Sequence, residues 1–417
     1  MAHECILGAQ PDRALLPVMV GRRPFPTPPA DLLTAARRQP PATFDEFSAA
    51  DRVFGTVEQR AEERAEHATA YRGHVVISPI RPEPGSVQIT TFGKLGLPLI
   101  ELGAPKPSQA RFYNAADPTG KPMEKGMLKA DMYGAGAGLR GFKVFARHRN
   151  LEDQDKNPEA QDKLDRYVRE KVRARVDAQE KRGRAQDGQS TKLRTKRNAS
   201  VLAWVRAGST FTFDIDVTNM TGPELGALLW LLDPHELAVP RELEQSGTAA
   251  DFGVFRLGRG RPLGLGSVTL EVLPDGSSLV QGEAVTTAYR DLSGRLGAVG
   301  QVPVDSGGTE HFTEVAKTLI ETFRTATGDA VGHSFDEASH IAALRRAATG
   351  YGDGVRVGYP RGSTKPRQGD DISEIVAWFQ LNEKVSTSRS GAPKIDHGYA
   401  LPSLTTDVTP LRELREK

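Results

Sequence analysis

Residues 210–218 read TFTFDIDVT and carry the clearest strand pattern in the chain. Their apolar and polar side chains alternate, which places the apolar ones on a single face. The apolar positions are Phe211, Phe213, Ile215 and Val217. Residues 201–206 form a second strand-like stretch, and Ala-Gly-Ser at 207–209 lies between the two. Together they predict a β-hairpin. The apolar stretch GPELGALLWLL at 222–232 then predicts a buried helix.

Outward from this stretch, further strands and helices complete a mixed pattern. Strands are predicted at 73–80, 86–92, 141–148, 252–256 and 267–273. Helices are predicted at 311–326 and 335–348, and a helix or a strand at 372–381. The order of strands and helices within 201–273 is typical of an α+β domain with an antiparallel sheet. We therefore expect an α+β fold with a more helical C-terminal part.

Changes in composition divide the chain into six parts. They are a Pro- and Arg-rich arm at 1–44, a β-rich segment at 45–150, a charged insertion at 151–200, a core at 201–300, a helical part at 301–390 and a tail at 391–417. The arm predicts at most one short helix, at 30–38. From Asn382 onward the polar, Pro-containing sequence predicts an end that frays.

The composition limits the class of protein. With 417 residues, of which 38% are hydrophobic, the chain can bury a core, and its length favours two lobes or one elaborated domain. The single cysteine, Cys5, excludes an internal disulfide framework and a zinc site built from several cysteines. No apolar run is long enough for a membrane span, and no clear secretion signal is present. We therefore expect a cytoplasmic protein without a membrane partner.

The net charge is only +2, so the placement of the charges is more informative than their sum. Residues 163–197 carry 13 Lys or Arg against 5 Asp or Glu. Near the end of this stretch, Arg194, Lys196 and Arg197 stand in a segment without acids. Two interpretations stay open: a solvated helix and loop, or a basic finger that contacts phosphates.

The sharpest chemical signal is the segment 252–268, FGVFRLGRGRPLGLGSV, called here the Gly-rich loop with its flanking strands. Glycines adopt positive φ and let a backbone approach a ligand closely, while arginines suit phosphate oxygens. The residues of interest are Arg256, Gly258, Arg259, Gly260, Arg261, Gly264 and Gly266. No Gly-Lys-Ser/Thr follows and no helix opens after the loop, which excludes a Walker A motif. We expect contact with a polyphosphate backbone such as RNA, against the alternative of a flexible hairpin loop.

Several stretches in order along the chain resemble motifs of the RAMP superfamily, the RNA-binding subunits of CRISPR effector complexes. Besides the Gly-rich loop, they are SAADRVFG at 48–55 with YRG at 71–73, LGAPKPS at 102–108 with FY at 112–113, LRGFKVF at 139–145 with His148, and VGYP at 357–360. The first pair resembles a signature of the type III backbone branch. The resemblance covers roughly residues 45–380. The chain departs from the pattern by lacking the I-P-G-S-S-L helix start of backbone members.

The resemblance implies an RRM- or ferredoxin-like fold with loop insertions that act as thumbs. It implies an RNA-binding subunit that holds CRISPR RNA for pairing with target RNA, beside other CRISPR effector subunits. Contacts to RNA would come from the Gly-rich loop, from the basic finger, and from Arg140, Lys143 and His148. No tightly bound cofactor is expected. Some relatives also cut target RNA with an acidic residue and a divalent metal, which leaves endoribonuclease activity with Mg²⁺ or Mn²⁺ as an alternative.

The acidic and aromatic candidates each have a structural alternative. Asp131 and Asp51 are the candidate catalytic acids, since metal-assisted cleavage needs a carboxylate near the scissile phosphate. The structural alternative for Asp51 is that it caps the turn before Phe54 or pairs with Arg52. Tyr113, Phe142 and Phe145 are candidate stacking platforms or core residues, His148 is a base or phosphate contact or a surface histidine, and Trp204 and Trp230 are assigned to the core. A third function of another class is a small-molecule enzyme that binds a phosphorylated ligand in a closed pocket beside the Gly-rich loop.

Overall fold

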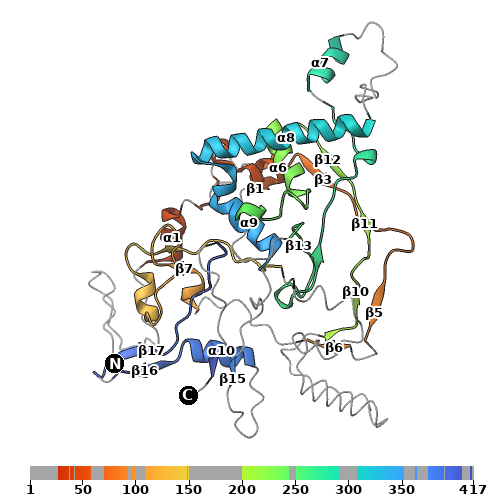
Figure 1. Cartoon of the computed structure of the whole chain (residues 1–417). Helices are drawn as coiled ribbons and strands as arrows, with labels where there is room; N and C mark the ends of the chain where they lie inside the picture. The colour runs from red at the N-terminus through yellow and green to blue at the C-terminus, as the bar shows by residue number, and fades with distance from the viewer. Residues whose placement is uncertain are drawn as a thin grey trace, which may run out of the picture.

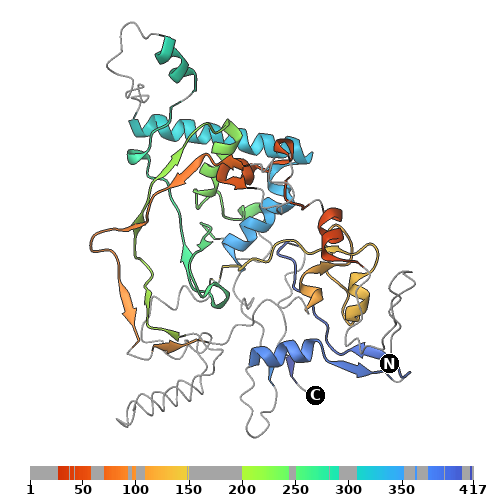
Figure 2. The same ribbon diagram turned by 180° about the vertical axis from the view of Figure 1, so that it is seen from behind.

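The computed structural model combines helices with short strand pairs in an α+β arrangement (Figures 1 and 2). It describes residues 27–36, 38–41, 43–57, 70–92, 96–99, 109–147, 149, 200–243, 250–280, 282–290, 308–351, 362–363, 374–388, 390–405 and 414–415. The predicted mixed class is confirmed. Within these ranges the strands pair in twos, and every pair is antiparallel except β15 (Gly362–Ser363) with β18 (Leu414–Arg415). No helix of the described part combines the length and the apolar character that crossing a bilayer requires.

A long antiparallel ribbon joins two segments far apart in the sequence, 75–98 and 200–217. Its pairs are β3 (Val75–Ile77) with β12 (Ile215–Val217), β4 (Arg81–Pro82) with β11 (Phe211–Thr212), β5 (Ile89–Thr91) with β10 (Ala203–Val205), and β6 (Leu97–Pro98) with β9 (Ser200–Val201). The predicted hairpin between 201–206 and 210–218 is therefore wrong. Both stretches are strands, but they follow one another along the same side of the ribbon (Figure 1).

The predicted alternation holds over residues 213–217 but not at the start of the stretch, where Phe211 is exposed and Thr212 is half-buried. Burial is modest throughout. Ile215 and Val217 are half-buried, whereas Asp214 and Asp216 are exposed. A ribbon of two strands has little to pack against, so apolar side chains such as Ile89 remain largely in solvent.

The predicted helices form a layer beside the ribbon. α6 (Gly222–Leu231) packs along α8 (Gly308–Val331), and α9 (Ser339–Thr349) packs below them (Figure 1). Gly226 permits the close approach, because a Cβ there would lie 2.0 Å from the carbonyl oxygen of Leu319. The core between these helices consists of Trp230, Leu237, Phe335, Ala338, Ile341 and Ala348. Trp230 is thus a core residue as predicted, and Trp204 is half-buried against Phe92.

A second group of elements surrounds the buried side chain of Arg111. Its helices are α1 (Pro29–Ala35), the 3-10 turns η3 (Ala110–Phe112) and η4 (Lys129–Tyr133), and α10 (Glu374–Asn382). Its strand pairs are β7 (Asn114–Ala115) with β8 (Gly138–Leu139), and β16 (Val385–Thr387) with β17 (Pro393–Ile395). Arg111 donates to Glu383 at 2.7 Å and to the carbonyl oxygen of Gly398 at 2.8 Å. The C-terminal part is thereby tied to residues 109–139.

Two local predictions need correction here. Residues after Asn382 do not begin a frayed end, because β16 and β17 form a hairpin and Asn382 exchanges hydrogen bonds with Tyr399. Residues 141–147 do not form the predicted strand, since only β8 just before them is paired. The charged insertion at 151–200 lies outside the described residues except for Ser200.

The remaining elements are short. They are η1 (Phe44–Glu46), α2 (Ala49–Phe54), β1 (Gly55–Val57) with β2 (Ala70–Arg72), η7 (Arg241–Leu243), β13 (Phe255–Arg256) with β14 (Ser267–Val268), η8 (Arg261–Leu263), η9 (Pro274–Gly276), α7 (Gly282–Arg290) and η11 (Phe335–Glu337). The predicted strand at 267–273 is thus limited to its first two residues. The short helix predicted at 30–38 is confirmed as α1.

Candidate nucleic-acid interface

The Gly-rich loop connects two paired strands, as the sequence predicts. β13 and β14 are antiparallel, with Phe255 opposite Val268 and Arg256 opposite Ser267. The four glycines of the loop all have positive φ, between 77° and 96°. At Gly266 the need is also steric, because a Cβ would lie 1.9 Å from the carbonyl oxygen of Leu257. The glycines therefore fix the path of the backbone.

The tip of the loop is anchored and does not project freely. It turns through η8, and Leu263 in this turn is 5% exposed. Leu263 packs with Leu99 at the far end of the ribbon, together with the half-buried Phe92, Val201, Trp204 and Leu265. A buried leucine contributes on the order of 2 kcal/mol to such a contact. The alternative of a flexible hairpin loop is therefore disfavoured.

The three arginines of the loop differ in their roles. Arg256 donates to Ser267 Oγ and, at 3.2 Å, to the carbonyl oxygen of Arg261, so it braces the loop across its base. Arg261 is exposed and places its guanidinium 5.7 Å from the ring centre of Phe145. Arg259 is exposed and makes no hydrogen bond or ion pair with any described residue. Arg259 and Arg261 are thus better placed than Arg256 to meet a ligand.

The contact between Arg261 and Phe145 brings a second basic segment, 138–147, to the Gly-rich loop. This segment leaves β8 and runs across to α9 and β13 (Figure 1). The amide of Arg147 donates to the carbonyl oxygen of Ala347 in α9, and its guanidinium donates to the carbonyl oxygen of Phe252 at 2.7 Å. The same guanidinium lies 4.5 Å from the centre of the Phe252 ring. Arg147 therefore fixes the segment beside the loop, a role for which the sequence carries no signal.

The cations of this segment differ in exposure: Arg147 is buried, Nε and Nη1 of Arg140 are buried, and only Lys143 is exposed. Arg140 is half-buried and engaged in contacts within the protein. Lys143 is exposed, yet nearby protein atoms remove enough water to lower the pKa of its ammonium below the ordinary value. Phe142 projects almost entirely into solvent, so the interpretation of this residue as core is wrong. His148, Arg194, Lys196 and Arg197 lie outside the described residues.

The candidate acids are not gathered into one site. Asp51 completes a capping box at the start of α2, in which Ser48 Oγ and the Ser48 amide donate to its carboxylate at 2.6 and 2.9 Å. These hydrogen bonds lower its pKa, and the capping role predicted as the alternative is confirmed. Asp131 is exposed on η4. Within the described ranges, no three His, Cys, Asp or Glu side chains cluster as metal ligands.

Two motifs of the RAMP resemblance meet in space. β1, which begins at the glycine of DRVFG, pairs with β2, so that Gly55 lies opposite Arg72 of YRG. Neither glycine leaves room for a side chain, because a Cβ on Gly55 would lie 2.6 Å from the amide nitrogen of Gly73 and a Cβ on Gly73 would lie 2.5 Å from the carbonyl carbon of Phe54. The contacts between the two motifs are thus structural. An ion pair of Arg52 with Glu224 also places the first motif against α6.

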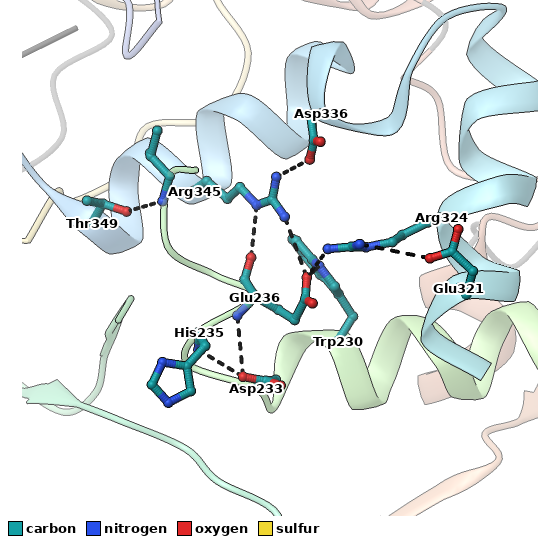
Figure 3. Close-up of polar contacts among 10 residues, drawn as sticks. Trp230, Asp233, His235, Glu236, Glu321, Arg324, Asp336, Arg345 and Thr349 are labelled. Atoms are coloured by element: carbon teal, nitrogen blue, oxygen red, sulfur yellow. Dashed lines mark hydrogen bonds and ion pairs between the residues drawn. The ribbon is translucent and has the colours of Figure 1, made fainter. Parts of the chain in front are cut away.

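A polar cluster around Glu236 lies in the helical layer (Figure 3). Its carboxylate accepts from Arg324 and from Trp230 Nε1, while the buried Arg345 donates to its carbonyl oxygen at 2.9 Å. An open hollow of about 580 Å³ adjoins it, lined by polar residues that include Asp329 and His333. None of the lining residues belongs to the Gly-rich loop. This hollow is therefore not the closed, apolar pocket that the small-molecule alternative predicts beside the loop.

No family model matches the chain, and no curated protein is similar enough to count as a match. The RAMP resemblance accordingly rests on the quoted motifs alone.

Proposed function

We propose that the chain is an RNA-binding subunit of the RAMP superfamily in a type III-like CRISPR effector complex. In this role it holds CRISPR RNA for pairing with target RNA, beside other effector subunits, on an RRM-like fold. The observation that supports the proposal is the meeting of the Gly-rich loop with the basic segment 138–147 through Arg261 and Phe145.

The charge and the backbone of this surface suit an RNA strand. Residues 255–268 contain three arginines and no acid, and residues 138–149 contain four Lys or Arg and no acid. Of these cations, Arg259, Arg261 and Lys143 are exposed. Phosphate contacts dominate nucleic-acid affinity and need such cations. A glycine backbone adds a place where sugar and phosphate approach closely. The near-neutral net charge of the chain is compatible with this, because only the local field is basic.

The test is to co-express the chain with the proteins encoded beside it, purify the complex, and sequence the RNA that copurifies. We expect small RNA derived from CRISPR repeats. The double substitution Arg259→Ala with Arg261→Ala should remove most of it. Lys317→Ala, which removes an exposed cation on α8, serves as the matched control and should retain it. Protein free of RNA at low salt, where phosphate contacts are strongest, would overturn the proposal.

A second function, cleavage of guide-paired RNA, is favoured by one observation at Asp131. Its exposed carboxylate makes no hydrogen bond or ion pair with the described residues, unlike that of Asp51. Asp131 alone does not make a metal site. Mg²⁺ is commonly held by one or two carboxylates together with substrate phosphates, so this alternative is tested by a cleavage assay with RNA and Mg²⁺ or Mn²⁺ present.

A further inference from the structure

Phe142 is the most solvent-exposed of the large apolar side chains in the described part, at 89%. It lies in the segment 138–147, one residue beyond Gly141, whose φ is +93°. The free energy falls when an apolar ring of this size is transferred out of water. A ligand that covers the ring would therefore be stabilised by its burial.

The surroundings of the ring are cationic. The guanidinium of Arg38, which follows α1, lies 5.1 Å from the centre of the Phe142 ring and covers one face. The same guanidinium lies at van der Waals contact distance, 3.7 Å, from the position that a Cβ on residue 141 would take. Lys143 follows directly in the sequence. The other face of the ring is open to solvent, since Phe142 is 89% exposed.

These neighbours decide between two kinds of occupant. An apolar pocket of a partner protein would have to desolvate Arg38 and Lys143 along with the ring, which is costly, and charged residues are depleted at the cores of protein interfaces. A nucleotide offers a flat base for the ring and a phosphate for the cations at once. A duplex does not present a free base face, so the base must be unpaired.

We infer that Phe142 is a stacking platform for an unpaired nucleobase, with Arg38 against its other face and Lys143 near the adjoining phosphate. The inference rests on the proposed RNA-binding function. It adds to that function a contact to a base that is splayed out of the guide or target strand. Phe142 binds a base face and carries no sequence preference of its own, because every base has a π-face.

The test measures binding of the purified full chain to two labelled probes by fluorescence anisotropy. One probe is a single-stranded oligouridylate, and the other is the same sugar-phosphate chain without bases. Phe142→Ala should weaken binding to the oligouridylate by about 5- to 100-fold and leave binding to the abasic chain unchanged. Phe142→Trp should restore binding. Val144→Ala removes a neighbouring exposed side chain of the same segment and should have no effect.

Each other outcome overturns a different statement. If wild type binds the oligouridylate and Phe142→Ala binds it equally well, the stacking inference fails while the proposed function stands. An equal loss on both probes would assign Phe142 to the fold or to phosphate contacts, against stacking. If Phe142→Ala keeps RNA but loses a copurifying effector subunit, the ring binds protein. If the wild type binds neither probe at low salt, the proposed function itself fails.

Discussion

Arg52 Nε donates a 2.6 Å hydrogen bond to Oε1 of Glu224, a carboxylate that is only 8% exposed. The bond joins α2, the helix of the DRVFG motif, to the first turn of α6. The other carboxylate oxygen of Glu224 accepts from the amide and the hydroxyl of Thr221, which completes a capping box. One side chain therefore caps a core helix and holds the N-terminal motif in place.

Glu224→Gln should reduce the free energy of unfolding at neutral pH by about 1–3 kcal/mol, because a charged hydrogen-bond acceptor is lost at a buried site. Partial burial alone would raise the pKa of Glu224, but the hydrogen bonds from Arg52 and Thr221 outweigh it and hold the pKa below its ordinary 4.5. A depressed folded-state pKa gives stability that is complete above the unfolded pKa and is lost as the pH falls through the folded value. The difference between wild type and variant should therefore shrink below pH 4.5.

Urea unfolding at neutral and acidic pH measures this difference. Glu314→Gln is the matched control, because Glu314 forms an exposed ion pair with Lys317 that contributes at most about 1 kcal/mol. A gap between wild type and Glu224→Gln that does not change with pH would contradict the assignment of the effect to the carboxylate charge.

Gly266→Ala should disrupt the Gly-rich loop more than Gly258→Ala. Both glycines have φ near +80°, which costs an alanine about 1–2 kcal/mol. Only at Gly266 does the new Cβ meet the backbone, 1.9 Å from the Leu257 oxygen, whereas no atom lies within 4 Å of a Cβ at Gly258. We expect Gly266→Ala to lower the thermal midpoint further and to weaken binding to RNA, as read by a thermal melt and by anisotropy. Equal effects of the two substitutions would show that the loop relaxes around Gly266.

Arg259→Ala and Arg256→Ala should affect RNA binding in different ways. Arg259 is exposed and unpaired within the described part, so its loss removes a phosphate contact and lowers the slope of log affinity against log salt by about 0.7. The thermal midpoint of the Arg259→Ala variant should equal that of the wild type. Arg256 bonds to Ser267 and to the Arg261 carbonyl, so its loss should lower the midpoint as well as the affinity. Binding curves across a salt series, with a thermal melt of each variant, separate the two roles. An unchanged salt slope for Arg259→Ala would remove it from the interface.

The sequence predicts those parts of the fold whose pattern is local. The helix at 222–232 follows from a continuous apolar run, and the helix at 311–326 follows from apolar residues on one face. The strands around the Gly-rich loop are bounded by their own turn residues. Alternation within 210–218 identifies a strand but says nothing of its partner. The partner strands lie within 75–82, far away along the chain, whereas the pattern alone favours the neighbouring stretch 201–206.

The candidate site shows the same limit. The Gly-rich loop is recognisable from its composition, and the positive φ of its glycines is confirmed. Arg147 holds residues 138–147 beside the Gly-rich loop, because it is buried under Phe252 and against α9. An arginine in a basic stretch predicts a solvent or phosphate contact, so this anchoring role emerges only from tertiary packing.

Asp131→Ala and Asp51→Ala should separate catalysis from stability. Asp51 is the third helical residue of a capping box, so its loss should cost about 0.5–1 kcal/mol at this half-buried position. Asp131 is exposed on η4 without a bond to its carboxylate in the described part, so its loss should leave stability unchanged. If the chain cleaves guide-paired RNA, Asp131→Ala should abolish the Mg²⁺- or Mn²⁺-dependent cut while RNA binding persists, and Asp51→Ala should retain it. The measurements are a thermal melt and a gel assay with end-labelled target RNA and the assembled complex. Cleavage by Asp131→Ala at the wild-type rate would exclude this residue as the catalytic acid, and loss of cleavage in Asp51→Ala at unchanged stability would move the assignment to Asp51.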